Sequence, residues 1–234
     1  MKRLDAKPSR ENIRNYLNEE SGFRHEDIKR FVSFLDKVEA PFSVCIDSPW
    51  GDGKTFLVKS VQMILEARNP NISGISLDDL PRWVIEEETM GTEPCAFLPF
   101  YFNAWENDML NNPLGSIVAS MAADREIDYE ESDDTLCKRA AAVIDSISSI
   151  FGYSLNASQF VENFSGTQLV DEYKKRRMIE GEIDKYVEEV LRERAETLVL
   201  FVDELDRCRP EYAIRLLTEI KHLSENNRII IVYS

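Results

Sequence analysis

Hydrophobic residues along the chain recur in two patterns, which predict strands and helices in alternation. Apolar side chains three or four positions apart indicate amphipathic helices, whereas short uninterrupted apolar runs indicate buried strands. Because the runs alternate with helical segments, they predict an α/β protein whose parallel sheet is covered by helices on both faces. The strands are expected at Phe42 to Ile46, Ala96 to Phe102, Leu198 to Val202 and Ile229 to Tyr233.

Helical patterns fill most of the chain between and before these strands. They predict a short helix after Ser9, a second from Ile28 to Val38, a third from Phe56 to Ile64, a helical segment within 71–94, further helices at 114–123, 136–151 and from about 168, and a last one from Pro210. We therefore expect three parts. Residues 1–40 form an N-terminal helical lead-in, 41–106 and 197–234 form the sheet-bearing core, and 107–196 form a helical insertion.

The turn after the first strand carries a phosphate-binding pattern. It matches G-x-x-x-x-G-K-[ST], with Ser48 in place of the first glycine. Two glycines let successive backbone N–H groups face a phosphate at the positive end of the next helix. Lys54 supplies a positive charge for the β- and γ-phosphates, and the Thr55 hydroxyl is a ligand for Mg²⁺. The expected nucleotide-binding residues are Pro49, Trp50, Gly51, Asp52, Gly53, Lys54, Thr55 and Phe56.

Two acids follow the most apolar strand. Asp203 is expected to hold Mg²⁺ together with Thr55, and Glu204 to orient and deprotonate an attacking water. Lys54 and Glu204 are therefore the candidate catalytic residues. An Asp-Glu pair favours a hydrolase over the kinases and GTPases of the same broad fold. The sequence has no N-K-x-D or T-K-x-D segment for guanine, so ATP is the expected nucleotide.

Three motifs together resemble the KAP family of P-loop NTPases. They are Trp50-Gly51-Asp52-Gly53-Lys54-Thr55, Phe102-Asn103-Ala104-Trp105 and Val202-Asp203-Glu204-Leu205-Asp206-Arg207-Cys208. The family joins a neuronal scaffold protein with bacterial proteins that include a phage-exclusion factor. Glu204 stands where the family usually has a second Asp. The resemblance implies an ASCE-type sheet, with Asp203 on Mg²⁺ and Glu204 as the base.

For several residues of these motifs, the sequence allows two possible roles. Asn103 and Trp105 either lie near the nucleotide or are a strand cap and a core aromatic, and Asp206 and Arg207 form either a structural ion pair or a contact between subunits. In this class the fourth strand lies between the first and the third, which would bring Ser234 near the γ-phosphate. A fifth strand and a lid are not apparent, so we expect a truncated or reduced domain in which one edge of the first strand is unpaired or covered by other means.

The resemblance implies Mg²⁺-dependent ATP binding and hydrolysis, as the motor or switch module of a bacterial anti-phage defence protein. The alternative is an ATP-dependent switch or scaffold with little turnover, which recruits partners through the helical insertion. A homo-oligomer or an effector protein is the expected partner. Many relatives carry transmembrane helices in the insertion, but residues 107–196 are acidic, so we expect no direct membrane insertion.

Composition narrows the remaining classes. The chain has 28 Lys and Arg against 43 Asp and Glu, a formal charge of −15, which disfavours nucleic acid as a partner. Cys45, Cys95, Cys137 and Cys208 are widely spaced and accompany only two His, which argues against a zinc finger or a disulfide framework. No apolar segment follows the basic start, so we expect no signal peptide and a cytoplasmic location.

Overall fold

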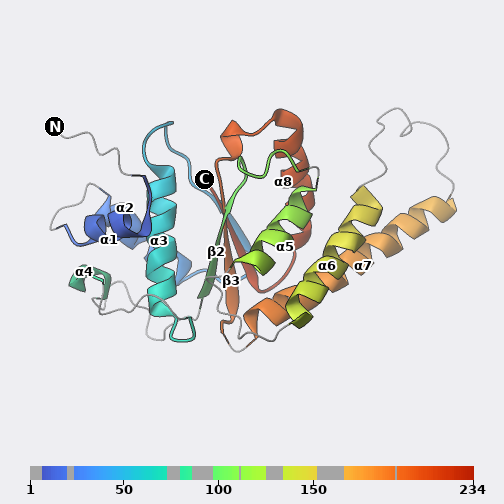
Figure 1. The fold of residues 1–234 in the computed structure, drawn as a ribbon, viewed down its shortest axis with the longest axis horizontal. Coiled ribbons are helices and arrows are strands. Elements are labelled where there is room, and N and C mark those ends of the chain that lie inside the picture. The colour runs from blue at the N-terminus through green and yellow to red at the C-terminus, as the bar shows by residue number, and fades with distance from the viewer. Residues whose placement is uncertain are drawn as a thin grey trace.

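The four strands form one parallel sheet in the order β1-β4-β3-β2 (Figure 1). They are β1 (Phe42–Cys45), β2 (Phe97–Asn103), β3 (Thr197–Asp203) and β4 (Ile229–Tyr233). This computed structural model describes residues 7–19, 24–72, 80–85, 97–110, 112–124, 134–151, 166–192 and 194–234. The predicted α/β class is confirmed, and so is the predicted place of the fourth strand between the first and the third.

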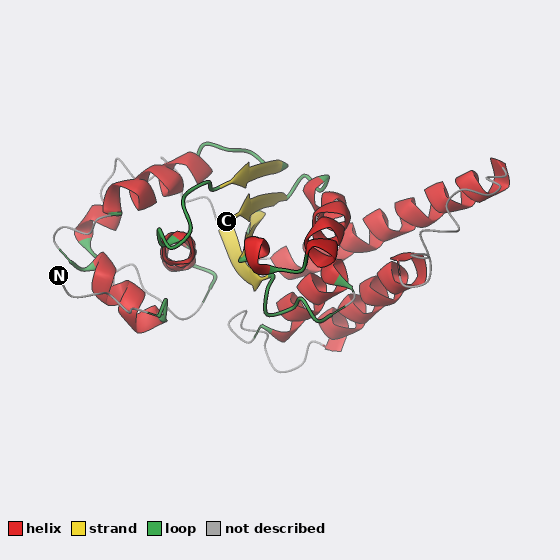
Figure 2. Cartoon of the chain, turned by 90° about the horizontal axis from the view of Figure 1, so that it is seen from above, coloured by secondary structure: helices red, strands yellow, loops and turns green. Residues whose placement is uncertain are grey.

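Helices cover both faces of the sheet, because alternate strand residues are apolar on each side (Figure 2). Val199 and Phe201 of β3 belong to the core on one face, whereas Leu198, Leu200 and Val202 belong to the core on the other. The first core is completed by α1 (Arg10–Leu17), α2 (His25–Leu35), α3 (Lys54–Arg68) and α4 (Arg82–Ile85), and the second by α5 (Pro113–Ala123), α6 (Asp134–Phe151), α7 (Gly166–Leu191) and α8 (Pro210–Ser224).

Two of the described helices, α1 and α5, begin at side-chain capping residues. Ser9 precedes α1, and its hydroxyl accepts a hydrogen bond from the backbone N–H of Asn12 at 3.3 Å. Asn112 caps α5 in the same way through Gly115 at 2.9 Å. Within the predicted helical segment 71–94, α4 is described, whereas the capping signal at Ser76 and Asp79 lies outside the described residues. Helices α6 and α7 run side by side and extend away from the sheet (Figure 1).

Local features of β2 and β1 fit their positions at the two edges of the sheet. Ala104 directs its N–H to the carbonyl of Asp203 in β3, so the backbone of Pro99 faces the open side of β2, where no donor is required. At the other edge, β1 pairs with β4 alone among the described residues, and its Phe42 is 38% exposed. Strand β1, which precedes the glycine-containing loop, is therefore the most solvent-exposed strand of the sheet.

An ion pair buried between α2 and α3 gives a stability prediction. The Arg68 guanidinium lies 3.0 Å from the Asp36 carboxylate, and their side chains are 3% and 6% exposed. Asp36→Ala would leave a buried charge without its partner, so we expect urea denaturation to show a loss of about 3–5 kcal/mol in unfolding free energy. Lys185→Ala is the control, because its pair with Glu182 is exposed and should contribute under about 1 kcal/mol. Equal losses in both variants would contradict the prediction.

Candidate nucleotide site

The loop between β1 and α3 has the backbone that a phosphate cradle requires. Gly51 and Gly53 both have φ of +82°, a conformation that residues with a Cβ rarely adopt. Gly53 is the N-cap of α3, so no side chain caps the helix, and no acidic residue lies in its first turn. The N–H groups at this end of α3 can therefore donate hydrogen bonds to an anion in place of a side-chain cap.

Side chains on both sides hold this loop in place. Asp52 forms an ion pair with Arg24 at 2.5 Å, and Lys54 Nζ donates a hydrogen bond to the Ser48 carbonyl at 3.0 Å. The ring of Phe56 packs edge-on against Tyr16 at 4.8 Å between centroids. The N-terminal helices thus support the loop from outside. Sequence reasoning missed Arg24, because a pairing with Asp52 cannot be inferred before the fold of the intervening chain is known.

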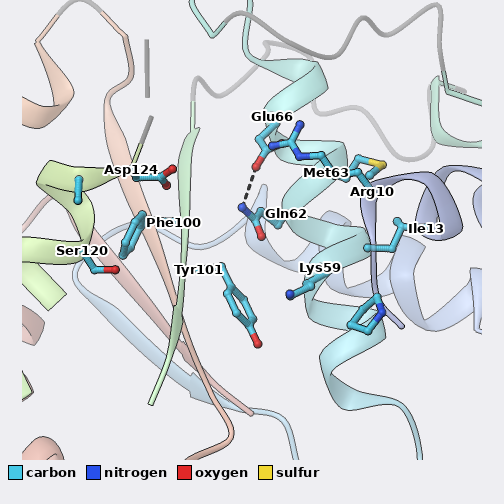
Figure 3. A pocket seen from close by; sticks show the side chains of 12 residues that line it. Arg10, Ile13, Lys59, Gln62, Met63, Glu66, Phe100, Tyr101, Ser120 and Asp124 are labelled. Atoms are coloured by element: carbon cyan, nitrogen blue, oxygen red, sulfur yellow. Dashed lines mark hydrogen bonds and ion pairs between the residues drawn. The ribbon is translucent and has the colours of Figure 1, made fainter. Parts of the chain in front are cut away.

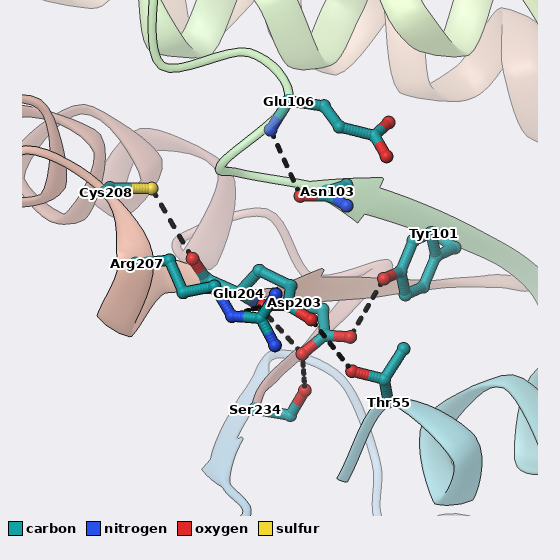
Figure 4. Close-up of polar contacts among 9 residues, drawn as sticks. All are labelled: Thr55, Tyr101, Asn103, Glu106, Asp203, Glu204, Arg207, Cys208 and Ser234. Carbon is teal, nitrogen blue, oxygen red and sulfur yellow. Dashed lines mark hydrogen bonds and ion pairs between the residues drawn. The ribbon is translucent and has the colours of Figure 1, made fainter. Parts of the chain in front are cut away.

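Asp203 is the buried acid at the end of β3, and three donors surround it (Figure 4). Its Oδ2 accepts a hydrogen bond from the Tyr101 hydroxyl at 2.8 Å. Its Oδ1 accepts from the Ser234 hydroxyl at 2.6 Å and from the backbone N–H of Glu204 at 2.8 Å. A carboxylate offers about four acceptor positions, so these three bonds fix its orientation and leave room for one more donor, such as a metal-bound water.

Glu204 lies beside the start of α3, and its carboxylate has different partners from those of Asp203. Its Oε1 accepts a hydrogen bond from the Thr55 hydroxyl at 3.3 Å, and its Oε2 pairs with the Arg207 guanidinium. Burial raises the pKa of Glu204 above its ordinary value, while Arg207 and Thr55 act in the opposite direction. Its backbone has φ of +62°, a left-handed conformation that costs roughly 1–2 kcal/mol for a non-glycine residue.

Tyr101 connects Asp203 to an open groove that lies beside β2 (Figure 3). The groove has a volume of about 440 Å³ and is lined by residues near α1 and from α3, β2 and α5. Within it, Lys59 Nζ lies 4.4 Å from the centre of the Tyr101 ring. Burial, followed by the charge of Asp203, raises the pKa of Tyr101, so its hydroxyl stays a hydrogen-bond donor. Sequence reasoning missed Tyr101, although it lies at the same end of the sheet as Asp203.

The structure separates the alternatives left open for the other motif residues. Asn103 caps the turn after β2, where its Oδ1 accepts a hydrogen bond from the N–H of Glu106 at 3.2 Å. Trp105 is 52% exposed, so the interpretation as a core aromatic is wrong. Arg207 pairs with Glu204, and its guanidinium lies beside the rings of Trp50 and Trp105.

Comparison with known families agrees with this geometry. A sequence model described as the KAP family P-loop domain matches residues 24–234. The chain belongs to this family. A comparison with curated proteins found no match. The matched range begins at Arg24, which pairs with Asp52 in the loop between β1 and α3, and it includes all three motifs. Membership of this P-loop family implies that the KAP domain binds a nucleotide.

The acidic helices of the KAP domain were expected to stay out of the membrane. Among the helices in the described ranges, none combines the length and the apolar character that crossing a bilayer would require. The helices concerned include α6 and α7, whose described parts lie within residues 107–196.

Proposed function

We propose that this KAP domain binds ATP with Mg²⁺ and hydrolyses it. The observation that best supports the proposal is the contact between the Thr55 hydroxyl and the Glu204 carboxylate at 3.3 Å. These residues are 149 positions apart in the chain and belong to the two motifs that carry the expected chemistry. The fold thus joins a phosphate-binding helix end to an acidic pair, as a nucleotide hydrolase requires.

Binding would depend mainly on the loop and on Lys54. The backbone N–H groups at the start of α3 would donate to phosphate oxygens, and the Lys54 ammonium would exchange the Ser48 carbonyl for the β- and γ-phosphates. Thr55 and Asp203 would hold Mg²⁺, Asp203 through its remaining acceptor position. Bound there, Mg²⁺ would supply positive charge against the negative charge of the phosphates.

Hydrolysis would use Glu204 as the general base. Its carboxylate accepts a proton from the water whose oxygen attacks the γ-phosphorus, and the bond to the leaving ADP oxygen breaks. A carboxylate with a raised pKa is a better proton acceptor than an ordinary one, and burial raises the pKa of Glu204 in this way. Asp203 is held by its three donors and would keep the metal side of the site in place.

In its biological role, we propose that the domain is the ATP-driven motor or switch of a bacterial anti-phage defence protein, acting in a homo-oligomer or on an effector protein. The motif resemblance supports this proposal. The second candidate is a scaffold that binds ATP with little turnover. The projection of α6 and α7 from the sheet favours it, because these helices offer a surface away from the nucleotide site (Figure 1).

The test is carried out on the unaltered protein. ATP with Mg²⁺ should raise the melting temperature, because ligand at ~100 times its Kd adds ~2.7 kcal/mol of stability. GTP and ATP with EDTA are the controls, and both should stabilise the protein less. No stabilisation by ATP with Mg²⁺ would overturn the proposal. Phosphate release is then measured over a range of protein concentrations, and binding without turnover at every concentration would favour the scaffold.

A further inference from the structure

A single arginine lies where three separate segments of the chain meet. The guanidinium carbon of Arg207 is 5.9 Å from the ring centre of Trp50 and 5.9 Å from that of Trp105. Trp50 belongs to the phosphate-binding loop and is 78% exposed, and Trp105 follows β2. Guanidinium groups are attracted to indole faces at such distances. Two aromatic rings therefore hold Arg207 from different parts of the fold.

The same guanidinium reaches the expected base. Glu204 has a left-handed backbone, after which the 3-10 turn η3 (Leu205–Arg207) brings Arg207 back over the Glu204 carboxylate. Arg207 engages Oε2, while Thr55 engages Oε1 (Figure 4). Both carboxylate oxygens are therefore oriented, one from the phosphate-binding helix and one from the turn.

We propose that Arg207 is a positioning residue, which holds the Glu204 carboxylate in the orientation needed to accept a proton from water. The inference rests on the proposed function and names a residue on which that function depends. Trp50 and Trp105 fix the guanidinium, so the phosphate-binding loop and the base share one support. A base oriented by a third group is a recurrent arrangement in hydrolytic sites.

A purely structural role for this pair would have a different signature. The Arg207 side chain is 43% exposed and that of Glu204 is 11% exposed, so solvent screens the guanidinium and the pair contributes modestly to folding. Loss of the guanidinium should therefore leave the melting temperature nearly unchanged. A positioning role predicts instead that the rate of hydrolysis falls while nucleotide affinity is kept, because Arg207 is not among the residues expected to bind phosphate.

The experiment measures single-turnover hydrolysis and nucleotide affinity in parallel. Arg207→Ala should lower the rate roughly 10–100-fold, the range found when partners that orient metal-binding side chains are removed. The Kd for ATP should change less than about threefold, which corresponds to less than about 1 kcal/mol of binding free energy. Arg207→Lys should be faster than Arg207→Ala but slower than the unaltered protein, because lysine keeps the positive charge and lacks the planar guanidinium with its several N–H donors. Arg192→Ala is the matched control, since Arg192 forms a pair of the same spacing with Glu189 on α7 and should keep the full rate.

A second arm tests whether Arg207 acts through Glu204. In a Glu204→Gln background, Arg207→Ala should cause no further loss, because the base is already absent. Trp105→Ala should lower the rate in the same direction, and Trp105→Phe should restore most of it.

The results distinguish failure of the positioning role from failure of the proposed function. A normal rate in Arg207→Ala, or an equal fold loss in the Glu204→Gln background, would overturn the positioning role and leave the proposed function intact. An unaltered protein that neither binds nor hydrolyses ATP would overturn the proposed function. If the unaltered protein binds ATP without hydrolysing it, both the proposal of hydrolysis and the positioning role of Arg207 are overturned.

Discussion

Replacing Lys54 with alanine should lower the affinity for ATP by roughly 10²–10⁴-fold, because Lys54 is expected to make at least two charge-assisted contacts to phosphate, each contributing about 1.5–3 kcal/mol. In the structure its Nζ donates to the Ser48 carbonyl across the loop, so the ammonium already lies within the cradle. Titration calorimetry with ATP and Mg²⁺ measures the effect.

The folded state should survive this change. Lys54 is not part of either apolar core, and its contact with Ser48 is one hydrogen bond that contributes about 1 kcal/mol. Lys221→Ala removes an exposed lysine of α8 and is the control for the loss of one positive charge. If Lys54→Ala and Lys221→Ala bind ATP equally well, the phosphate site has been assigned to the wrong residues.

Glu204→Gln should lower the single-turnover rate by roughly 10²–10⁴-fold, the usual contribution of a general base. Glutamine keeps the shape of the side chain and can still accept a hydrogen bond from Thr55, so nucleotide binding should be retained. The amide cannot take up a proton from water, and this is the property the variant removes. Quenched-flow measurement of phosphate release with enzyme in excess gives the rate directly.

A neighbouring acid provides the control for charge. Asp206 lies in the same turn, two residues beyond Glu204, and contributes a repulsive charge to it. Asp206→Asn should therefore hydrolyse ATP within a few-fold of the unaltered protein. A similar loss in Asp206→Asn and Glu204→Gln would mean that the net charge of the turn matters and that Glu204 is not the base.

The features that the sequence predicted correctly depend on neighbouring residues. Uninterrupted apolar runs specify strands, and Gly51 and Gly53 specify a turn with positive φ directly before a helix. The place of β4 between β1 and β3 was also predicted, because it is the arrangement expected of the ATPase class that the motifs indicate. The glycine turn and the position of the acidic pair at the end of β3 could therefore be predicted before the fold was known, whereas their roles toward a nucleotide stay predictions.

The features that were missed depend on packing between distant segments. Tyr101 reaches Asp203 because β2 and β3 are adjacent in register, and the sequence gives no sign that this tyrosine points toward the acid. The wrong interpretation of Trp105 has a similar cause. Trp105 lies in the loop after β2, which is linked to the start of α8 because Arg209 Nε donates a hydrogen bond to Asp108 at 3.1 Å, and its indole is exposed.

The order of the strands also bears on how the site comes into being during synthesis. The phosphate-binding loop is attached to β1 and the acidic pair to β3, and among the described residues these two strands are joined only through β4. β4 is the last of the four to leave the ribosome, since it follows the others in the chain. Chains fold from the N-terminus as they emerge, and pairings between distant segments form slowly. Both halves of the proposed nucleotide site therefore exist before they can meet, and the site is complete only when β4 has been inserted between them.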